Sequence, residues 1–481
     1  MTPGQVVGTT HGPVRGTAAA GVLAFLGVPY AAPPVGELRF RPPAPPRAWA
    51  EPRDCTAHGP TAPQAPPEGP VSALLPHVSI PGADHLNLNV WTADTAGSRP
   101  VMVFVHGGSF TSGAGSIPTY DGSRFARDGV VLVTVNYRLG ADGFLWLGAG
   151  TANLGLLDQV AALEWVRDNI ASFGGDPSNV TVFGESAGAM SVCTLLAMPA
   201  ASGLFRRAIA QSGAARCVLS ADTAARIGRS LCELLGVEPS REAVAAVPTS
   251  RLLSAQVQLA LDVAGSSDPL RWGEDAARNI MPFEPVVDGH VLPVAPEQAL
   301  ADGASADVDL MIGTNADEGN LFFVPTGITA HADEAALAHV ARSRCYPRPV
   351  VDAYRAAHPT ASPGELISEL MTGEFYRAPA LQAALSHRGS YMYEFAWRSP
   401  AFDGRMGACH ALELPFVFDT LDGPGYGALL GEAPPQAVAD AMHRAWIAFA
   451  TTGDPGWPAY DTTTRAAMRF DTASTQLTDY R

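Results

Sequence analysis

Apolar runs alternate with stretches of helical periodicity from about residue 100 onward. Six runs have the length and composition of buried strands: 101–108, 130–140, 179–185, 206–213, 308–315 and 390–397. Between the second and third runs, four apolar residues at helical spacing predict one buried helix face: Leu156, Val160, Leu163 and Ile170. Continuous apolar strands that alternate with helices are typical of the α/β class, in which a mostly parallel sheet has helices on both faces.

The other segments indicate how this core is elaborated. Prolines cluster between Pro29 and Pro76, so this stretch is expected to form extended loops rather than helices. Residues 219–275 and 331–390 are alanine-rich and helix-like, and we interpret them either as helical cap insertions over a site or as further cover for the sheet. We find no internal repeat and no linker, so residues 1–481 are expected to form one domain.

Composition excludes several kinds of partner. The 481 residues are 47% hydrophobic and 16% charged, which is ample for a large core. The net charge is −16, so neither nucleic acid nor an anionic membrane surface is an expected partner, because both attract a basic face. No apolar run is long enough to span a bilayer. Residues 1–12 lack the basic and apolar regions of a signal peptide, and we therefore expect a cytoplasmic protein.

The six cysteines lie far apart and form neither a CxxC pair nor a zinc-ligand spacing. We therefore expect reduced thiols, no metal site and no cofactor. Cys217 and Cys232 are near enough in sequence to form a disulfide, and the sequence leaves open whether they do.

The pentapeptide Gly-Glu-Ser-Ala-Gly at 184–188 ends one of the predicted strands. A serine hydroxyl is a weak nucleophile near neutral pH, and it needs a base to take its proton and donors to hold an oxyanion. Gly-x-Ser-x-Gly between a strand and a helix forms a sharp turn that lifts the serine hydroxyl clear of the sheet. The next helix is expected to begin near Ala187, with its free N–H groups toward a reacting carbonyl. Ser186 is therefore the candidate nucleophile.

A second glycine-bearing loop, His-Gly-Gly-Ser-Phe at 106–110, follows another predicted strand. Such a loop supplies a further oxyanion donor in hydrolases with a serine on a sharp turn. The expected donors are the N–H groups of Gly108 and Ser109, with that of Ala187 as the third. We expect His106 to stabilise the loop rather than to act as the base, because in these enzymes the histidine follows the serine along the chain.

The base and the carboxylate that orients it are therefore expected C-terminal to Ser186 in the chain. His410 is the preferred histidine, since it lies between Gly407 and an apolar, helix-like run. The carboxylate is expected between the serine and the histidine in chain order. Glu318 follows a predicted strand in a polar loop, where the strand end would place it above the sheet. Asp317 is its adjacent rival, and spacing alone does not separate the two.

Eight stretches carry a resemblance that spans nearly the whole chain: 27–43, 88–91, 106–110, 136–145, 153–188, 313–319, 409–418 and 453–461. Their motifs and order resemble those of the type-B carboxylesterases, the branch of the α/β-hydrolases that also contains the cholinesterases. The resemblance implies the α/β-hydrolase fold and a Ser-Glu-His triad. It assigns Ser186 as nucleophile, His410 as general base and then acid, and Glu318, in place of Asp317, as the group that orients His410.

The same resemblance supports Gly108, Ser109 and Ala187 as the oxyanion hole. It also gives Ser212 a family role in supporting the triad carboxylate, with strand-end packing as the alternative. The sequence departs from the family pattern in its N-terminal loop, where Ala62 and His85 replace both cysteines of the usual disulfide. Losing both is consistent with a reducing compartment, and we interpret His85 as a loop residue.

Two further departures concern charge and substrate. The family glutamate that pairs with Arg39 is replaced by Ala83, so Arg39 needs another partner or remains solvated. Residues 63–84 contain no tryptophan, although the cholinesterases hold a quaternary ammonium there by a cation–π contact. Choline esters are therefore not expected substrates.

The leading expectation is hydrolysis of a small-molecule carboxylic ester through an acyl-enzyme on Ser186. Acyl transfer or lactone formation in a biosynthetic pathway would use the same residues and is the alternative. A non-catalytic binding module is disfavoured, because the candidate triad is intact. Four apolar residues are candidates for the pocket lining, although each fits a core position equally well: Phe110, Phe283, Leu321 and Phe322.

Overall fold

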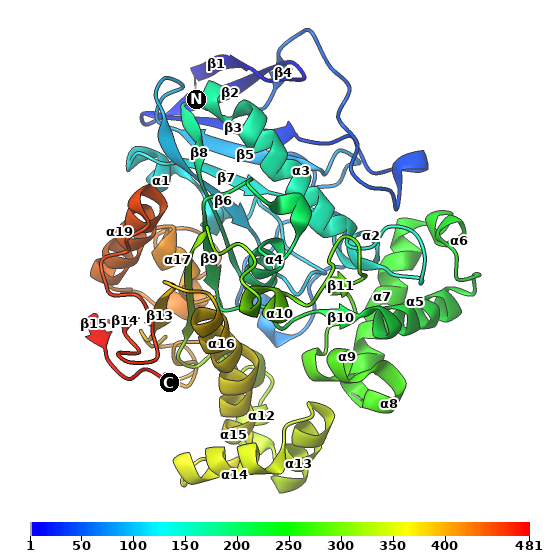
Figure 1. Ribbon diagram of the computed structural model, residues 1–481, viewed down its shortest axis with the longest axis vertical. Helices are drawn as coiled ribbons and strands as arrows, with labels where there is room; N and C mark the ends of the chain where they lie inside the picture. The colour runs from blue at the N-terminus through cyan, green and yellow to red at the C-terminus, as the bar shows by residue number, and fades with distance from the viewer. Residues whose placement is uncertain (1, 267) are drawn as a thin grey trace.

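One large sheet runs through the computed structural model, which describes residues 2–266 and 268–481 (Figure 1). The strands are β1 (Thr2–Gly8), β2 (Pro13–Ala19), β3 (Val22–Pro29), β4 (Arg53–Asp54), β5 (Asn87–Thr92), β6 (Arg99–Val105), β7 (Val131–Val135), β8 (Gly175–Glu185), β9 (Arg207–Gln211), β10 (Leu219–Ser220), β11 (Val286–Val287), β12 (Asp309–Asn315), β13 (Tyr391–Phe395), β14 (Ala467–Phe470) and β15 (Thr475–Leu477). The sheet order is β1-β2-β3-β5-β7-β6-β8-β9-β12-β13-β14-β15, with β4 beside β2 and a separate β10–β11 pair.

The middle of the sheet is parallel, as the six apolar runs predicted. From β7 through β6, β8, β9, β12 and β13 to β14, each neighbouring pair is parallel. The N-terminal strands β1, β2, β3, β5 and β7 pair antiparallel in that order, β4 pairs parallel with β2, and β15 returns antiparallel to β14. These edge strands were not predicted, because several are short, half-exposed and rich in small or polar residues.

Helices follow most strands of the parallel part. They are α1 (Ser123–Arg127), α2 (Gly140–Phe144), α3 (Leu154–Asn169), α4 (Ala187–Leu195), α5 (Ala221–Leu235), α6 (Arg241–Ala245), α7 (Thr249–Ser266), α8 (Pro269–Trp272), α9 (Glu274–Asn279), α10 (Pro296–Ala301), α11 (Asn320–Phe323), α12 (Ile328–His331), α13 (Glu334–Ser343), α14 (Arg348–Ala357), α15 (Pro363–Met371), α16 (Ala378–Ser386), α17 (Leu414–Val417), α18 (Gly427–Leu430) and α19 (Gln436–Thr452). A mostly parallel sheet whose strands are followed by helices is the α/β architecture that the sequence predicted.

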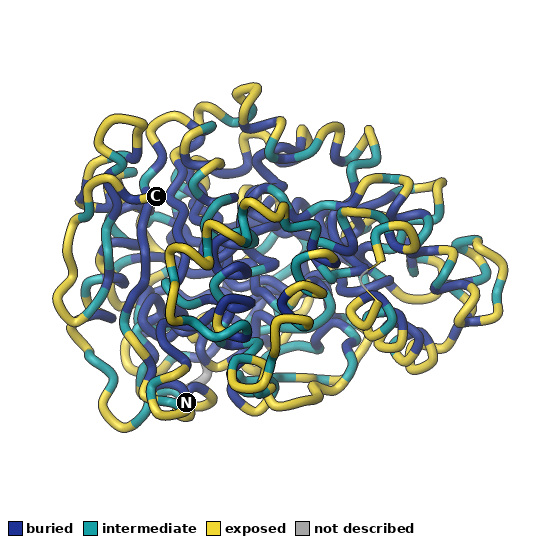
Figure 2. Tube along the Cα trace, turned by 90° about the horizontal axis from the view of Figure 1, so that it is seen from below, coloured by how far each residue is buried: buried dark blue, intermediate teal, exposed yellow. Residues whose placement is uncertain are grey.

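Strand β6 shows how the sheet separates two cores. Its alternate residues Val101, Val103 and Val105 join the core under α3 and α4, whereas Met102 and Phe104 join the core under α19. Side chains that alternate between faces are the expected consequence of strand geometry, and burial on both faces explains the continuous apolar run. Figure 2 shows the resulting buried interior, with exposed residues confined to loops and outer helix faces.

The two alanine-rich segments are helical, as expected. The first gives α5 to α9, which project to the right in Figure 1, and the second lies within α12 to α16, of which α12 to α15 project at the bottom. The second group has a small core of its own, in which Leu337 of α13 packs with Leu366, Ile367 and Leu370 of α15. The second group adjoins the candidate site, because Thr372 and Arg377 of the segment between α15 and α16 bond to the turn that follows β12.

Candidate active site

Ser186 lies on the sharp turn between β8 and α4. Its backbone has φ 56° and ψ −123°, a strained combination for a residue with a side chain. A Cβ on Gly184 would lie 2.5 Å from the carbonyl carbon of Gly188, and a Cβ on Gly188 would overlap the carbonyl oxygen of Val105. The glycines are therefore required by close backbone approach. Ser186 is half-exposed, and its N–H donates to the carbonyl of Gln211 at 2.8 Å.

The 106–110 loop lies directly against this serine. A Cβ on Gly107 would be 3.0 Å from the Cβ of Ser186, so the contact leaves no room for a side chain. Gly108 has φ +108°, which favours glycine. Among the described residues, the N–H groups of Gly108, Ser109 and Ala187 have no acceptor. The three free donors thus lie on the residue after the serine and on the loop that touches it, as an oxyanion hole requires.

His106 is a buried part of the same loop. Its Nδ1 lies 2.8 Å from the carbonyl oxygen of Gly107, and its ring stacks on Tyr137 with centroids 4.5 Å apart. Burial lowers the pKa of His106 to about 4, so the ring is neutral near pH 7. This environment agrees with the loop-stabilising role expected for it.

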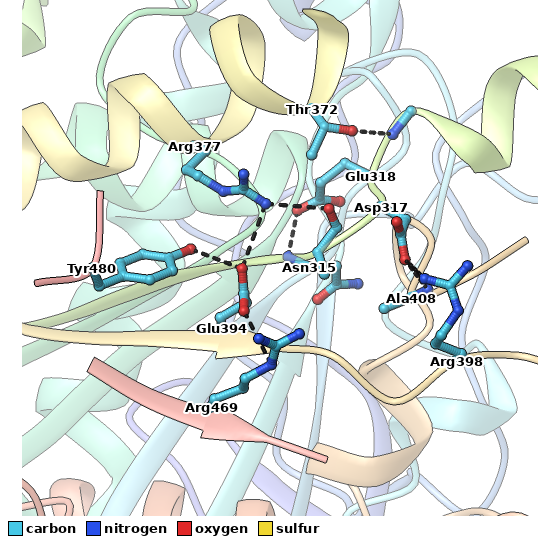
Figure 3. Close-up of polar contacts among 12 residues, drawn as sticks. Asn315, Asp317, Glu318, Thr372, Arg377, Glu394, Arg398, Ala408, Arg469 and Tyr480 are labelled. Carbon is cyan, nitrogen blue, oxygen red and sulfur yellow. Dashed lines mark hydrogen bonds and ion pairs between the residues drawn. The ribbon is translucent and has the colours of Figure 1, made fainter. Parts of the chain in front are cut away.

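Glu318 and His410 meet above the ends of β12 and β13. Oε2 of Glu318 lies 2.7 Å from Nδ1 of His410, while its Oε1 accepts the N–H of Asn315 at 2.8 Å. Asp317 turns elsewhere: it accepts the N–H of Ala408 at 2.8 Å and pairs with Arg398 (Figure 3). The structure therefore places Glu318, and not Asp317, against the histidine.

The other ring nitrogen of His410 faces a carboxylate that sequence reasoning did not assign. Nε2 lies 3.1 Å from Oε1 of Glu185, outside hydrogen-bond geometry. Within the described residues, Ser186 Oγ makes no hydrogen bond to His410. Such bonds are often loose in ligand-free enzymes and tighten when substrate binds. The structure thus joins Glu318 to His410 and the serine to its donor loop, while the serine–histidine bond is not formed.

Three buried carboxylates surround His410. Glu413 accepts from Gln211 at 3.2 Å and from Asn315 at 2.7 Å. Burial alone would lower the pKa of His410, but the charge of Glu185 and the hydrogen bond to Glu318 raise it overall. Burial raises the pKa of Glu185. Both additional carboxylates lie inside the family-like stretches 153–188 and 409–418, one before Ser186 and one a helical turn after His410, so their proximity could have been anticipated.

A cavity of about 290 Å³ opens against the donor loop and the residue before the serine, because Gly107, Gly108 and Glu185 all line it. Much of the remaining lining is apolar or aromatic: Val71, Leu75, Ile117, Tyr120, Leu414 and Tyr426. Polar side chains contribute as well: Glu68, Ser72, His77 and Ser112.

The four residues that the sequence suggested as pocket lining do not line this cavity. Phe110, Phe283 and Leu321 are buried in the cores. Phe322 instead packs against His410, with ring centroids 5.4 Å apart. The candidates were wrong for this cavity because apolar residues near a site fill the core as readily as the pocket.

The expectations for Ser212 and Arg39 have different outcomes. Ser212 does not support Glu318: its buried hydroxyl has no hydrogen-bond partner, and the carboxylate takes the N–H of Asn315 instead. Arg39 does find a partner, in Asp142 at 3.2 Å, and also donates to the carbonyl of Val247.

The remaining open points concern His85 and the cysteines. His85 belongs to the loop before β5 but is buried, which lowers its pKa to about 4. Cys217 and Cys232 are free thiols, as are the other four cysteines.

Across residues 2–266 and 268–481, no three His, Cys, Asp or Glu side chains gather so that they could hold a metal ion. No helix in the same ranges is long and apolar enough to cross a membrane.

Known proteins resemble the chain over its whole length. The model of the carboxylesterase family matches residues 3–480. The para-nitrobenzyl esterase of Bacillus subtilis is 41% identical over 98% of this chain and 96% of its own, and the phenmedipham hydrolase of Pseudarthrobacter oxydans is 36% identical over 96% and 94%. The structure of a Geobacillus stearothermophilus carboxylesterase superimposes with a TM-score of 0.86 at 40% identity, covering 98% of both chains.

Proposed function

The chain belongs to the carboxylesterase family and is a carboxylic-ester hydrolase, and we propose that it works through an acyl-enzyme on Ser186. The observation that carries this proposal is a set of three N–H groups without an acceptor, on the residue after Ser186 and on the loop that packs against it, together with a bonded Glu318–His410 pair. The match of the family over residues 3–480 also supports one domain across residues 1–481.

The proposed reaction has two halves. Ser186 Oγ attacks the ester carbonyl carbon as His410 Nε2 takes the hydroxyl proton. The N–H groups of Gly108, Ser109 and Ala187 hold the oxyanion. His410 then gives the proton to the departing alcohol, and a water molecule, activated by the same nitrogen, releases the acid. Glu318, bonded to Nδ1, keeps the imidazole oriented and stabilises its charged form.

The cavity against Gly107, Gly108 and Glu185 suits a neutral, apolar alcohol group. Its walls include Val71, Leu75 and Ile117, and no described residue between 63 and 84 is a tryptophan that could bind a cation. The name of the para-nitrobenzyl esterase describes an aromatic ester as its substrate, and we propose substrates of that class for this chain.

A matched ester series tests the substrate class. Benzyl acetate and acetylcholine share an acyl group and differ in the charge of the alcohol. The ratio of their kcat/KM values therefore reports whether the enzyme prefers a neutral or a cationic alcohol group. We expect benzyl acetate to be preferred by at least about tenfold, since the apolar side chains of the lining favour a neutral alcohol group, whereas a cation must lose its hydration. Equal values, or a preference for acetylcholine, would reject the neutral-alcohol assignment.

A further inference from the structure

The helix that joins α15 to α16 widens for one turn. Residues Thr372–Arg377 form a π-helical segment, η6, between these two α-helices. A Cβ on Gly373 would overlap the hydroxyl of Tyr354 from α14, so a side chain at this position would have to displace that tyrosine. Single π-helical turns inside α-helices are uncommon and occur frequently at functional sites.

The two ends of η6 hold the turn that carries Glu318. At one end, Thr372 Oγ1 accepts the N–H of Gly319, the residue after the glutamate, at 3.0 Å. At the other end, Arg377 Nη2 donates to the carbonyl oxygen of Ala316 at 3.2 Å. Figure 3 shows Thr372 and Arg377 reaching this turn from above. The carboxylate is thus bracketed on both sides by one helical segment.

Between these ends, η6 also reaches the histidine. Tyr376 is buried, and its ring lies against His410 with centroids 4.9 Å apart. Phe322 packs against the imidazole as well. The two aromatic rings limit rotation of His410, whose Nδ1 already bonds to Glu318.

Arg377 is held in turn by a buried carboxylate on β13. Oε1 of Glu394 lies 3.5 Å from Arg377 Nη2 and accepts the hydroxyl of Tyr480 at 3.2 Å. Its Oε2 pairs with Arg469 Nε at 3.4 Å. Two arginines therefore share one acceptor, but only Arg377 extends to the Ala316 carbonyl (Figure 3).

We propose that η6 is a positioning element for the reaction: Thr372 and Arg377 fix the turn that carries Glu318, and Tyr376 supports His410. This inference rests on the proposed function, since it assumes that the Glu318–His410 pair is catalytic. Thr372 and Arg377 act through the turn that carries Glu318, and Tyr376 acts through its contact with the His410 ring.

The two arginines of Glu394 provide a matched test. Arg377→Met removes the bond to Ala316, whereas Arg469→Met removes a comparable charge partner of Glu394 without touching the turn. Concentrations of competent sites are measured by fluorophosphonate titration, and kcat is expressed per labelled site. We expect Arg377→Met to lower kcat by about 10- to 100-fold with little change in KM, because small misalignment of catalytic groups is costly. Arg469→Met should keep kcat within about twofold.

The pH profile adds a readout that loss of stability would not move. A displaced Glu318 bonds His410 less well, so the acid limb of kcat/KM should shift to lower pH in Arg377→Met and stay in place in Arg469→Met. Thr372→Val and Thr372→Ser test the other end independently. The valine variant should lose kcat, and the serine variant, which keeps the hydroxyl, should retain it.

The outcomes separate this inference from the proposed function. Equal kcat values per labelled site in the two arginine variants, or in the two Thr372 variants, would overturn the positioning role. If Ser186→Ala keeps its turnover, the proposed function itself fails, whatever the arginine variants do. An inactive Ser186→Ala together with the predicted arginine difference supports both.

Discussion

Oε2 of Glu318 lies 2.7 Å from Nδ1 of His410, although 92 positions separate the two residues in the chain. The adjacent carboxylate, Asp317, accepts the N–H of Ala408 and so ties the turn of Glu318 to the segment that leads into His410. One carboxylate therefore orients the histidine, and its neighbour fastens the two loops together.

This division of roles predicts different effects for two isosteric substitutions. Glu318→Gln should lower kcat by about 10³- to 10⁴-fold, because an amide neither stabilises the imidazolium nor holds the required tautomer. Asp317→Asn keeps an acceptor for Ala408 and should cost less than about tenfold. Steady-state kinetics on a p-nitrophenyl ester measures both. Equal losses in the two variants would contradict the assignment of Glu318.

The rate should depend on pH through His410. Only the neutral imidazole can take the serine proton, and its pKa is raised overall by Glu185 and Glu318. The rate should therefore rise with pH through an apparent pKa above the usual value of about 6.5. Glu185→Gln should move this limb to lower pH, whereas Glu68→Gln, an exposed residue at the rim of the cavity, should not. A rate that is flat between about pH 5 and 8 would contradict His410 as the base.

The donor loop can be tested by comparing two glycines with positive φ. A Cβ at Gly108 would overlap the carbonyl of Ser112 and displace the donors, so Gly108→Ala should lower kcat by about 10²- to 10³-fold. Gly129 has φ +91° and open space around its Cβ position. Gly129→Ala should therefore destabilise the fold slightly and leave kcat unchanged. Similar kcat losses in both variants would assign the effect to backbone strain alone.

Glu284 predicts a pH-dependent contribution to stability. The side chain is fully buried, with one oxygen bonded to Asn279 at 2.9 Å and the other unpartnered. Burial raises its pKa well above the ordinary value, so the folded state holds a proton that the unfolded chain releases. This contribution is complete below the unfolded pKa and is lost as pH rises through the folded pKa, each unit of pKa shift being worth about 1.4 kcal/mol.

Glu284→Gln removes this titration while keeping the bond to Asn279. The Tm difference between the variant and the parent should therefore grow in favour of the variant as pH increases from about 5 to 9. Glu432→Gln, at an exposed position, is the control and should show a constant difference. A Tm difference for Glu284→Gln that stays constant with pH would contradict a raised pKa.

Much of the site could be predicted because its chemistry constrains the sequence. Ser186 needs small neighbours on a tight turn, and the clashes that a Cβ at Gly184 or Gly188 would make explain why those positions are glycine. The parallel strands could be predicted because burial on both faces leaves a continuous apolar run. The antiparallel strand β2 carries no comparable signal, since it is half-exposed and contains Arg15, Gly16 and Thr17.

Other features depend on contacts that a linear pattern does not encode. Ser212 was assigned by its motif alone, whereas the partner of Glu318 is the backbone N–H of Asn315. Arg39 meets Asp142, a residue 103 positions away that no motif connects to it. The π-helical turn at 372–377 also lacks a periodic signature, because a single widened turn does not disturb the helical composition around it.

The central claim is that Ser186 carries the acyl group, and a fluorophosphonate probe tests it most directly. The probe should label one site per chain, the modified peptide should contain Ser186, and activity should disappear in proportion to labelling. Ser186→Ala should remain folded, take no label and lose turnover by at least about 10⁴-fold. Label on another residue, or esterase activity that persists in fully labelled protein, would contradict the account.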